Sequence, residues 1–78
     1  MFDILVVEDD AKLNQIYCSA LRNNSFNAVP AFDGEEALNI MAEKNFDLVI
    51  SDIMMPGVDG YELTRELREY YPELPILM

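Results

Sequence analysis

The sequence ILVVEDD at residues 4–10 joins a run of four large apolar residues to three consecutive carboxylates. A second segment, LVISD at residues 48–52, has the same form and ends in Ser51 and Asp52. Short runs rich in Val and Ile are typical of strands buried on both faces, as in parallel sheets. Because ligands of open α/β sheets bind at the carboxyl ends of the strands, both segments predict a site at those ends.

The acidic residues of the two segments converge if the segments are neighbouring parallel strands. Glu8, Asp9 and Asp52 then meet at one rim of the sheet, where carboxylates repel one another by about 1–4 kcal/mol per pair in a surface-like dielectric. A hard divalent cation offsets this repulsion, and Mg²⁺ prefers oxygen ligands. We therefore expect a Mg²⁺ site at this rim, whereas Asp10 is placed to cap the helix that follows.

The composition predicts one small domain with its own core. The chain has 78 residues, 51% of them hydrophobic, and a net charge of −10 that disfavours direct contact with nucleic acid or an anionic membrane. Cys18 is the only cysteine and there is no histidine, which excludes an internal disulfide and His-based catalysis. Apolar runs are too short for a membrane span, and no signal peptide is present, so we expect a cytoplasmic protein.

Hydrophobic periodicity predicts alternating strands and helices. A strand over residues 2–7 is followed by a helix capped by Asp10, with turn-forming residues at 23–25 ending it. The apolar stripe of this helix is expected to pack on the sheet and consists of Leu13, Ile16, Tyr17, Ala20 and Leu21. A run over residues 26–32 contains Pro30, which predicts an edge strand.

The second half of the chain continues the same alternation. Asp33 is expected to cap a helix over residues 35–44, and a buried strand follows at residues 48–51. A turn-rich loop leads to a helix over residues 61–71, and an apolar strand begins at Pro75. This order predicts an α/β fold with a parallel sheet and helices on its faces.

Four motifs in this order resemble the receiver domain of two-component response regulators: ILVVEDD, DGEEAL at residues 33–38, LVISDIMMPGVDGYEL at residues 48–63 and LPILM at residues 74–78. The resemblance implies a three-layer, doubly wound, flavodoxin-like fold with strand order 2-1-3-4. It covers residues 1–78, about two-thirds of such a domain, which would be truncated at the start of its fourth strand. The fifth strand and the last helices would then be absent.

The resemblance also implies the site. Asp52 would be the phosphoacceptor that attacks a phosphohistidine of a sensor histidine kinase, with Asp9 a direct Mg²⁺ ligand and Glu8 acting through water. The implied metal ligands are thus Glu8, Asp9, Asp52 and the backbone carbonyl of Met54, in a loop shaped by Pro56 and Gly57. Receivers also carry a Ser or Thr and a Lys that contact the phosphoryl group, on strands that would follow Met78.

We therefore expect a phosphorylation-controlled switch of a phosphorelay, a regulatory domain and not an enzyme, joined to a DNA-binding output domain in its parent protein. Two alternatives remain open. A truncated receiver could act only by self-association or partner binding, because residues 76–78 would form an exposed apolar strand edge. A phosphatase of the haloacid dehalogenase type also uses an aspartate nucleophile, but it needs a second Asp where this chain has Met54.

Overall fold

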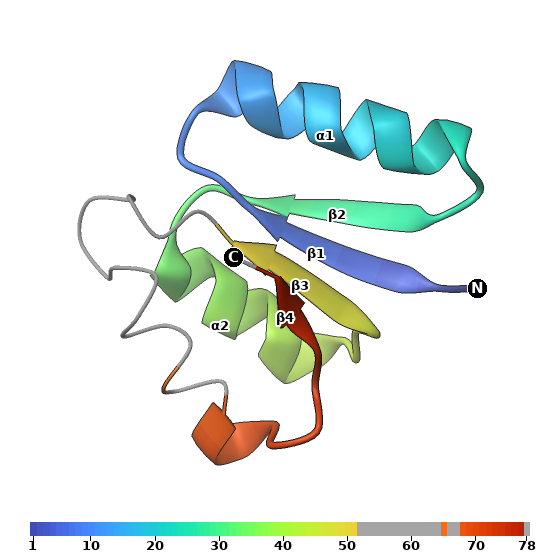
Figure 1. Ribbon diagram of the computed structural model, residues 1–78. Coiled ribbons are helices and arrows are strands. Elements are labelled where there is room, and N and C mark those ends of the chain that lie inside the picture. Colours follow the sequence, from blue (N-terminus) through green and yellow to red (C-terminus); the bar gives the residue numbers. More distant parts are fainter. Residues whose placement is uncertain (52–64, 66–67, 78) are drawn as a thin grey trace.

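Strands and helices alternate along the computed structural model, which describes residues 1–51, 65 and 68–77 (Figure 1). The elements are β1 (Asp3–Val7), α1 (Ala11–Asn23), β2 (Asn27–Ala31), α2 (Gly34–Glu43), β3 (Leu48–Ser51) and β4 (Ile76–Leu77). The strands form one parallel sheet in the order β2-β1-β3-β4. The expected α/β fold and strand order are therefore confirmed.

Helices cover both faces of the sheet, with α1 on one side and α2 on the other (Figure 1). Because side chains alternate along a strand, β1 supplies both layers of the core. On the α1 side the buried residues are Ile4, Val6, Cys18 and Ala28. On the α2 side they are Leu5, Val7, Ala31, Ala37, Met41, Phe46 and Val49.

The apolar stripe predicted for α1 does not face the sheet, which corrects the expectation from periodicity. Leu13, Ile16 and Tyr17 are exposed by 39%, 56% and 43%, while Asn14 and Cys18 are the buried residues of the helix. Of the predicted stripe, Leu21 alone packs against the core. The helix is turned so that the Asn14 amide reaches backbone carbonyls at the ends of the strands, which need donors when buried.

The two helix starts agree with the predicted caps. Asp10 Oδ1 accepts hydrogen bonds from the backbone N–H groups of Lys12 and Leu13 at the start of α1. Asp33 Oδ1 accepts from the N–H of Glu36, whose own carboxylate accepts from the N–H of Phe32. The bond to Asp33 satisfies a donor that the helix start leaves unpaired, and the bond to Glu36 ties the residue before the cap to the first turn of α2.

Helix α1 ends in a Schellman motif built around a serine. The N–H of Phe26 donates to the carbonyl of Leu21, and the N–H of Ser25 donates to the carbonyl of Arg22. The motif requires a left-handed residue after the cap, and Ser25 has a φ of 70°. The turn predicted at residues 23–25 is thus confirmed, although glycine is the usual residue at this position.

Strand β2 lies at the edge of the sheet, as Pro30 predicted. Alternate residues of a parallel strand direct their backbone groups to opposite sides, and the N–H of Asn27 points toward β1, where it bonds to Phe2. The backbone groups of Ala28 and Pro30 therefore point away from β1, toward the open edge of the sheet. The missing N–H of Pro30 lies on the open side, and the outward carbonyl of Ala28 accepts from Arg22 Nη2 at 2.7 Å.

The final strand is confirmed as β4, which pairs in parallel with β3 through Val49 and Ile76. Of the helix predicted over residues 61–71, the structure describes residue 65 and residues 68–71, and residues 65 and 68–70 are helical. The rest of that predicted helix lies outside the described residues. No described helix is long and apolar enough to cross a membrane.

Candidate functional site

The register of the sheet brings the two carboxylate-bearing segments to one rim. β1 and β3 are neighbouring parallel strands, and Val7 is the register partner of Ser51. Glu8 and Asp9 therefore leave the sheet beside the end of β3, as the sequence predicted. Asp52 is the next residue after Ser51, but it lies outside the described residues together with Met54, Pro56 and Gly57.

Glu8 is fixed at the carboxyl end of β1. The residue is 5% exposed, and its N–H donates to the carbonyl of Ala31 at 3.0 Å. Its Oε2 accepts from the N–H of Asp10, also at 3.0 Å. The turn that follows β1 therefore holds the Glu8 carboxylate in place.

The next two acidic residues have different surroundings from Glu8. Asp9 is exposed at the rim, and Asp10 is committed to capping α1 through its bonds to Lys12 and Leu13. The side chain suited to reach a bound cation directly is therefore that of Asp9, not that of Asp10. This separation of roles agrees with the prediction for Asp10.

Asn14 is a polar residue of this region that the sequence analysis did not identify. It is completely buried, and its Nδ2 donates to the carbonyls of Val6 at 3.2 Å, Glu8 at 3.1 Å and Ala31 at 2.9 Å. The Cys18 thiol donates to its Oδ1 at 3.3 Å. The spacing of Asn14, Cys18 and Leu21 at i, i+4 and i+7 was the signal, but the predicted stripe included neither the polar Asn14 nor Cys18.

A hollow of about 340 Å³ opens beside these strand ends and is lined by Val6, Val7, Glu8, Tyr17, Ile50 and Ser51. Ser51 is 4% exposed, and its Oγ has no hydrogen-bond partner within the described part of the chain. Buried hydroxyls usually have a partner. A buried carboxylate and a buried hydroxyl thus border the same hollow at the end of β1 and β3.

Oxygen donors at this rim suit Mg²⁺ better than a soft metal, because carboxylate and carbonyl oxygens are its usual ligands. Within residues 1–51, 65 and 68–77 no group of three or more His, Cys, Asp or Glu side chains is arranged to hold a metal ion. Glu8 and Asp9 supply two carboxylates there. A third would have to come from outside the described residues.

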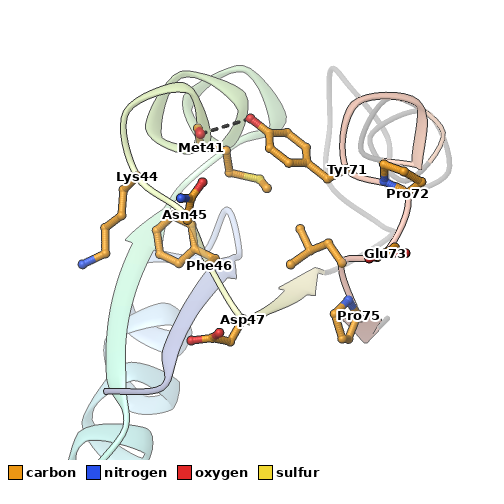
Figure 2. A pocket seen from close by; sticks show the side chains of 10 residues that line it. Met41, Lys44, Asn45, Phe46, Asp47, Tyr71, Pro72, Glu73 and Pro75 are labelled. Atoms are coloured by element: carbon orange, nitrogen blue, oxygen red, sulfur yellow. Dashed lines mark hydrogen bonds between the residues drawn. The ribbon is translucent and has the colours of Figure 1, made fainter.

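A larger cavity, of about 470 Å³, lies at the opposite end of the strands, between the end of α2 and the segment that leads into β4 (Figure 2). Its lining includes Phe46, Asp47, Leu74 and Pro75, which precede β3 and β4. Ligands of parallel sheets bind at the carboxyl ends of the strands. Size alone therefore does not make this cavity the candidate site.

Comparison with known proteins identifies one family. Residues 4–78 match the family described as "Response regulator receiver domain". Among curated proteins, the chain is 40% identical over 78 residues to the heme response regulator HssR of Staphylococcus epidermidis. The match covers 100% of this chain and 34% of HssR, so the chain spans about a third of that relative.

Solved structures agree with this family in fold. The chain superposes on chemotaxis protein CheY4 of Vibrio cholerae with a TM-score of 0.97 at 34% identity, covering 100% of this chain and 67% of that chain. Response regulator TrrA of Thermotoga maritima, in complex with Mg²⁺ and BeF, gives 0.93 at 37% identity, covering 97% and 66%. TrrA has also been crystallised in complex with the histidine kinase ThkA.

Proposed function

Because the chain belongs to the response regulator receiver domain family, we propose that it is a phosphorylation-controlled switch in a two-component phosphorelay. The observation that carries the proposal is the pairing of β1 with β3, which brings Glu8 and Asp9 to the same rim of the sheet as Ser51, the last described residue before Asp52. The relative TrrA was crystallised in complex with Mg²⁺ and BeF, which supports a Mg²⁺-dependent function for this chain.

Asp52 is the proposed phosphoacceptor. A carboxylate oxygen of Asp52 attacks the phosphorus of a phosphohistidine, the P–N bond breaks, and the imidazole leaves with the electron pair. A carboxylate needs no general base for this attack, which agrees with a chain that has no histidine. The work of the surrounding residues is to position the carboxylate and to offset charge.

The proposed Mg²⁺ ligands are Asp9, Asp52 and the backbone carbonyl of Met54, with Glu8 acting through water and Pro56 and Gly57 shaping the loop. When bound, the ion neutralises charge that develops on the phosphoryl oxygens. Exposure of Asp9 and burial of Glu8 support their separate roles. The Glu8 carboxylate already accepts from the N–H of Asp10, which suits it to orienting a bound water.

Two substitutions that each remove one negative charge test the assignment of Asp9 as a direct Mg²⁺ ligand. Asp9→Asn should weaken Mg²⁺ binding by more than about tenfold, because it removes a direct ligand. Asp10→Asn removes the same charge one residue later and keeps a good capping side chain, so Mg²⁺ affinity should change by less than about threefold. Equal losses in the two variants would mean that the rim attracts Mg²⁺ only through its net charge.

Phosphorylation tests the nucleophile. Incubation with acetyl phosphate and Mg²⁺ should label the protein, and peptide mapping should place the label on Asp52. Asp52→Asn should abolish labelling, while Asp33→Asn, a change at a helix cap on another loop, should leave it intact. A label on any other residue would contradict the proposed phosphoacceptor.

The proposed partners of this chain, which we place in the cytoplasm, are a sensor histidine kinase and a DNA-binding output domain in the parent protein. The crystallised pair of TrrA and ThkA supports the first. This chain matches 34% of HssR, so that relative is long enough to hold a further domain, which agrees with an output domain in the parent protein. Since the net charge of these residues is −10, DNA contact is assigned to the output domain. Phosphorylation of the full-length protein should change its affinity for DNA.

Self-association is a second candidate function, favoured by the position of β4. This strand is at the edge of the described sheet, and Leu77 is 58% exposed. An open apolar edge can pair with a strand of another chain. The 78-residue chain should therefore sediment as an oligomer, and Leu77→Lys should shift it toward the monomer. Monomeric sedimentation of the unsubstituted chain would contradict this candidate.

A further inference from the structure

The buried amide of Asn14 connects the ends of two strands to helix α1. Its Nδ2 lies within 3.2 Å of carbonyl oxygens of both β1 and β2, and of the carbonyl of Glu8 in the turn that follows β1. Two amide hydrogens are thus shared among three acceptors. Through these hydrogen bonds Asn14 links α1 to the carboxyl ends of β1 and β2.

The contact with Glu8 acts on the peptide group that leads to Asp9. The carbonyl of Glu8 and the N–H of Asp9 belong to one planar unit, so a hydrogen bond that fixes the carbonyl fixes the plane of that peptide. The N–H of Glu8 is held in turn by the carbonyl of Ala31, which Asn14 also contacts. The backbone on both sides of Glu8 is therefore oriented by one side chain.

Cys18 holds the amide in place from the next turn of the helix. Its thiol donates to Asn14 Oδ1 at 3.3 Å, and both side chains are at least 98% buried. The oxygen of the amide faces the thiol, so the nitrogen faces the carbonyls. The donor at position 18 thus supports the orientation of the amide that the three carbonyls require.

We propose that Asn14 is a positioning residue for the cation site, and that Cys18 supports it by orienting its amide. The inference rests on the proposed function, in which Asp9 is a direct Mg²⁺ ligand. Asn14 is completely buried, so its proposed role is indirect. It acts by holding the Glu8–Asp9 peptide in the orientation from which the Asp9 carboxylate reaches the rim.

A purely structural role for Asn14 makes a different prediction. If the amide only satisfied buried carbonyls, its loss would lower stability and leave the Mg²⁺ affinity of the folded protein unchanged. A positioning role lowers the affinity of the folded protein itself. Substitution of a residue that orients a metal ligand typically lowers metal affinity by about 10–100-fold.

The experiment measures Mg²⁺ affinity calorimetrically, in the protein at its natural length and at a temperature where each variant is folded. Asn14→Leu removes the donors at similar volume and should weaken binding by about 10–100-fold. Met41→Ala, a large truncation on the opposite face of the sheet, is the control for loss of stability and should bind Mg²⁺ like the parent. Equal affinities of Asn14→Leu and the parent would overturn the inference.

A second pair of variants keeps the test informative if Asn14→Leu does not fold. Cys18→Ser retains a donor to Asn14 Oδ1 and should bind Mg²⁺ within about twofold of the parent, while Cys18→Ala lacks the donor and should bind about two- to fivefold more weakly. Identical affinities in the two variants would overturn the supporting role of Cys18. If the parent protein bound no Mg²⁺, the proposed function and this inference would both fail. If the parent binds Mg²⁺ and Asn14→Leu binds it equally well, only this inference fails.

Discussion

The hydroxyl of Tyr71 donates a hydrogen bond of 3.1 Å to the backbone carbonyl of Met41 and so ties the segment before β4 to the last turns of α2 (Figure 2). Met41 is buried in the core on this face, and Tyr71 packs against the same cluster. Tyr71→Phe keeps the ring and removes the bond, so the free energy of unfolding should fall by about 1 kcal/mol.

Tyr70, next to Tyr71 in the sequence, provides the control for the Tyr71→Phe measurement. Tyr70 is 70% exposed, and Tyr70→Phe should change the free energy of unfolding by less than about 0.5 kcal/mol in the same urea titration. Equal losses in the two variants would show that the contact between Tyr71 and Met41 contributes nothing measurable.

Ser25 predicts a stabilising substitution. Its φ of 70° is unfavourable for a residue with a Cβ atom and costs nothing for glycine, so Ser25→Gly should raise the free energy of unfolding by about 0.5–1 kcal/mol. The same exchange at Ser19, inside α1, should lower it by a similar amount. Thermal unfolding of both variants checks the opposite signs, and destabilisation by Ser25→Gly would refute the argument.

Asp3 predicts an acid-dependent contribution to stability. The hydrogen bond from Asn27, and secondarily the nearby Lys44 ammonium at 3.4 Å, lower the pKa of Asp3 below its ordinary value of 3.8. A carboxyl whose pKa is lowered by folding stabilises the folded state above pH 3.8, and this contribution is lost as the pH falls through the lower, folded pKa.

Carboxyl titration by NMR can separate the two causes. Asn27→Ala and Lys44→Gln should each move the pKa of Asp3 back toward its ordinary value, because the hydrogen bond from Asn27 and the charge and hydrogen bond of Lys44 all lower it. An unchanged pKa in either variant would show that the contact removed in that variant does not lower the pKa of Asp3.

Cys18 should resist thiol reagents in the folded protein. Burial raises the pKa of the Cys18 thiol, so the reactive thiolate is disfavoured, and the side chain is only 2% exposed. Labelling by Ellman's reagent should be at least about a hundredfold slower than in urea, which corresponds to an opening free energy of about 2.7 kcal/mol.

The pH dependence of this group has the opposite sign to that of Asp3. A thiol whose pKa is raised by folding favours the folded state fully below its ordinary pKa, and that contribution is lost as the pH rises through the raised value. Labelling at the same rate with and without urea would show that the thiol is accessible in the native protein.

The strands were predictable because each one needs only local information. The run at residues 4–7 is apolar on both sides, and residues 48–51 repeat the pattern, so burial between two layers of helices could be inferred from composition. Pro30 marked an edge because its missing N–H excludes a central position. Helix starts followed from Asp10 and Asp33, whose side chains act within one turn.

The orientation of α1 was not predictable from periodicity. The predicted stripe was wrong because apolar side chains were taken to define the buried face, whereas Asn14 is drawn inward by carbonyls of β1 and β2. Those acceptors lie 8 and 17 residues away in the sequence, and their need for a donor exists only once the sheet has formed. Burial of a polar residue therefore depends on tertiary contacts that hydrophobic periodicity does not describe.

The candidate site also has features that were predictable from the sequence and features that were not. The convergence of Glu8 and Asp9 with the end of β3 was predictable from strand order, and the register of Val7 with Ser51 confirms it. The bond between Glu8 and the N–H of Asp10 was not predictable, because it depends on the path of the turn. The roles of Asp52, Met54, Pro56 and Gly57 stay predictions, since these residues lie outside the described part of the chain.

The outer side of β2 limits how copies of this domain could assemble. Pro30 offers no N–H, and the carbonyl of Ala28 is already bonded to Arg22, so a strand arriving at this edge finds no regular ladder. If copies associate through β4 as proposed, head-to-tail stacking of β4 of one copy on β2 of the next is therefore disfavoured. Pairing of two β4 strands about a two-fold axis would avoid β2 and would close as a dimer, not as an open-ended fibre.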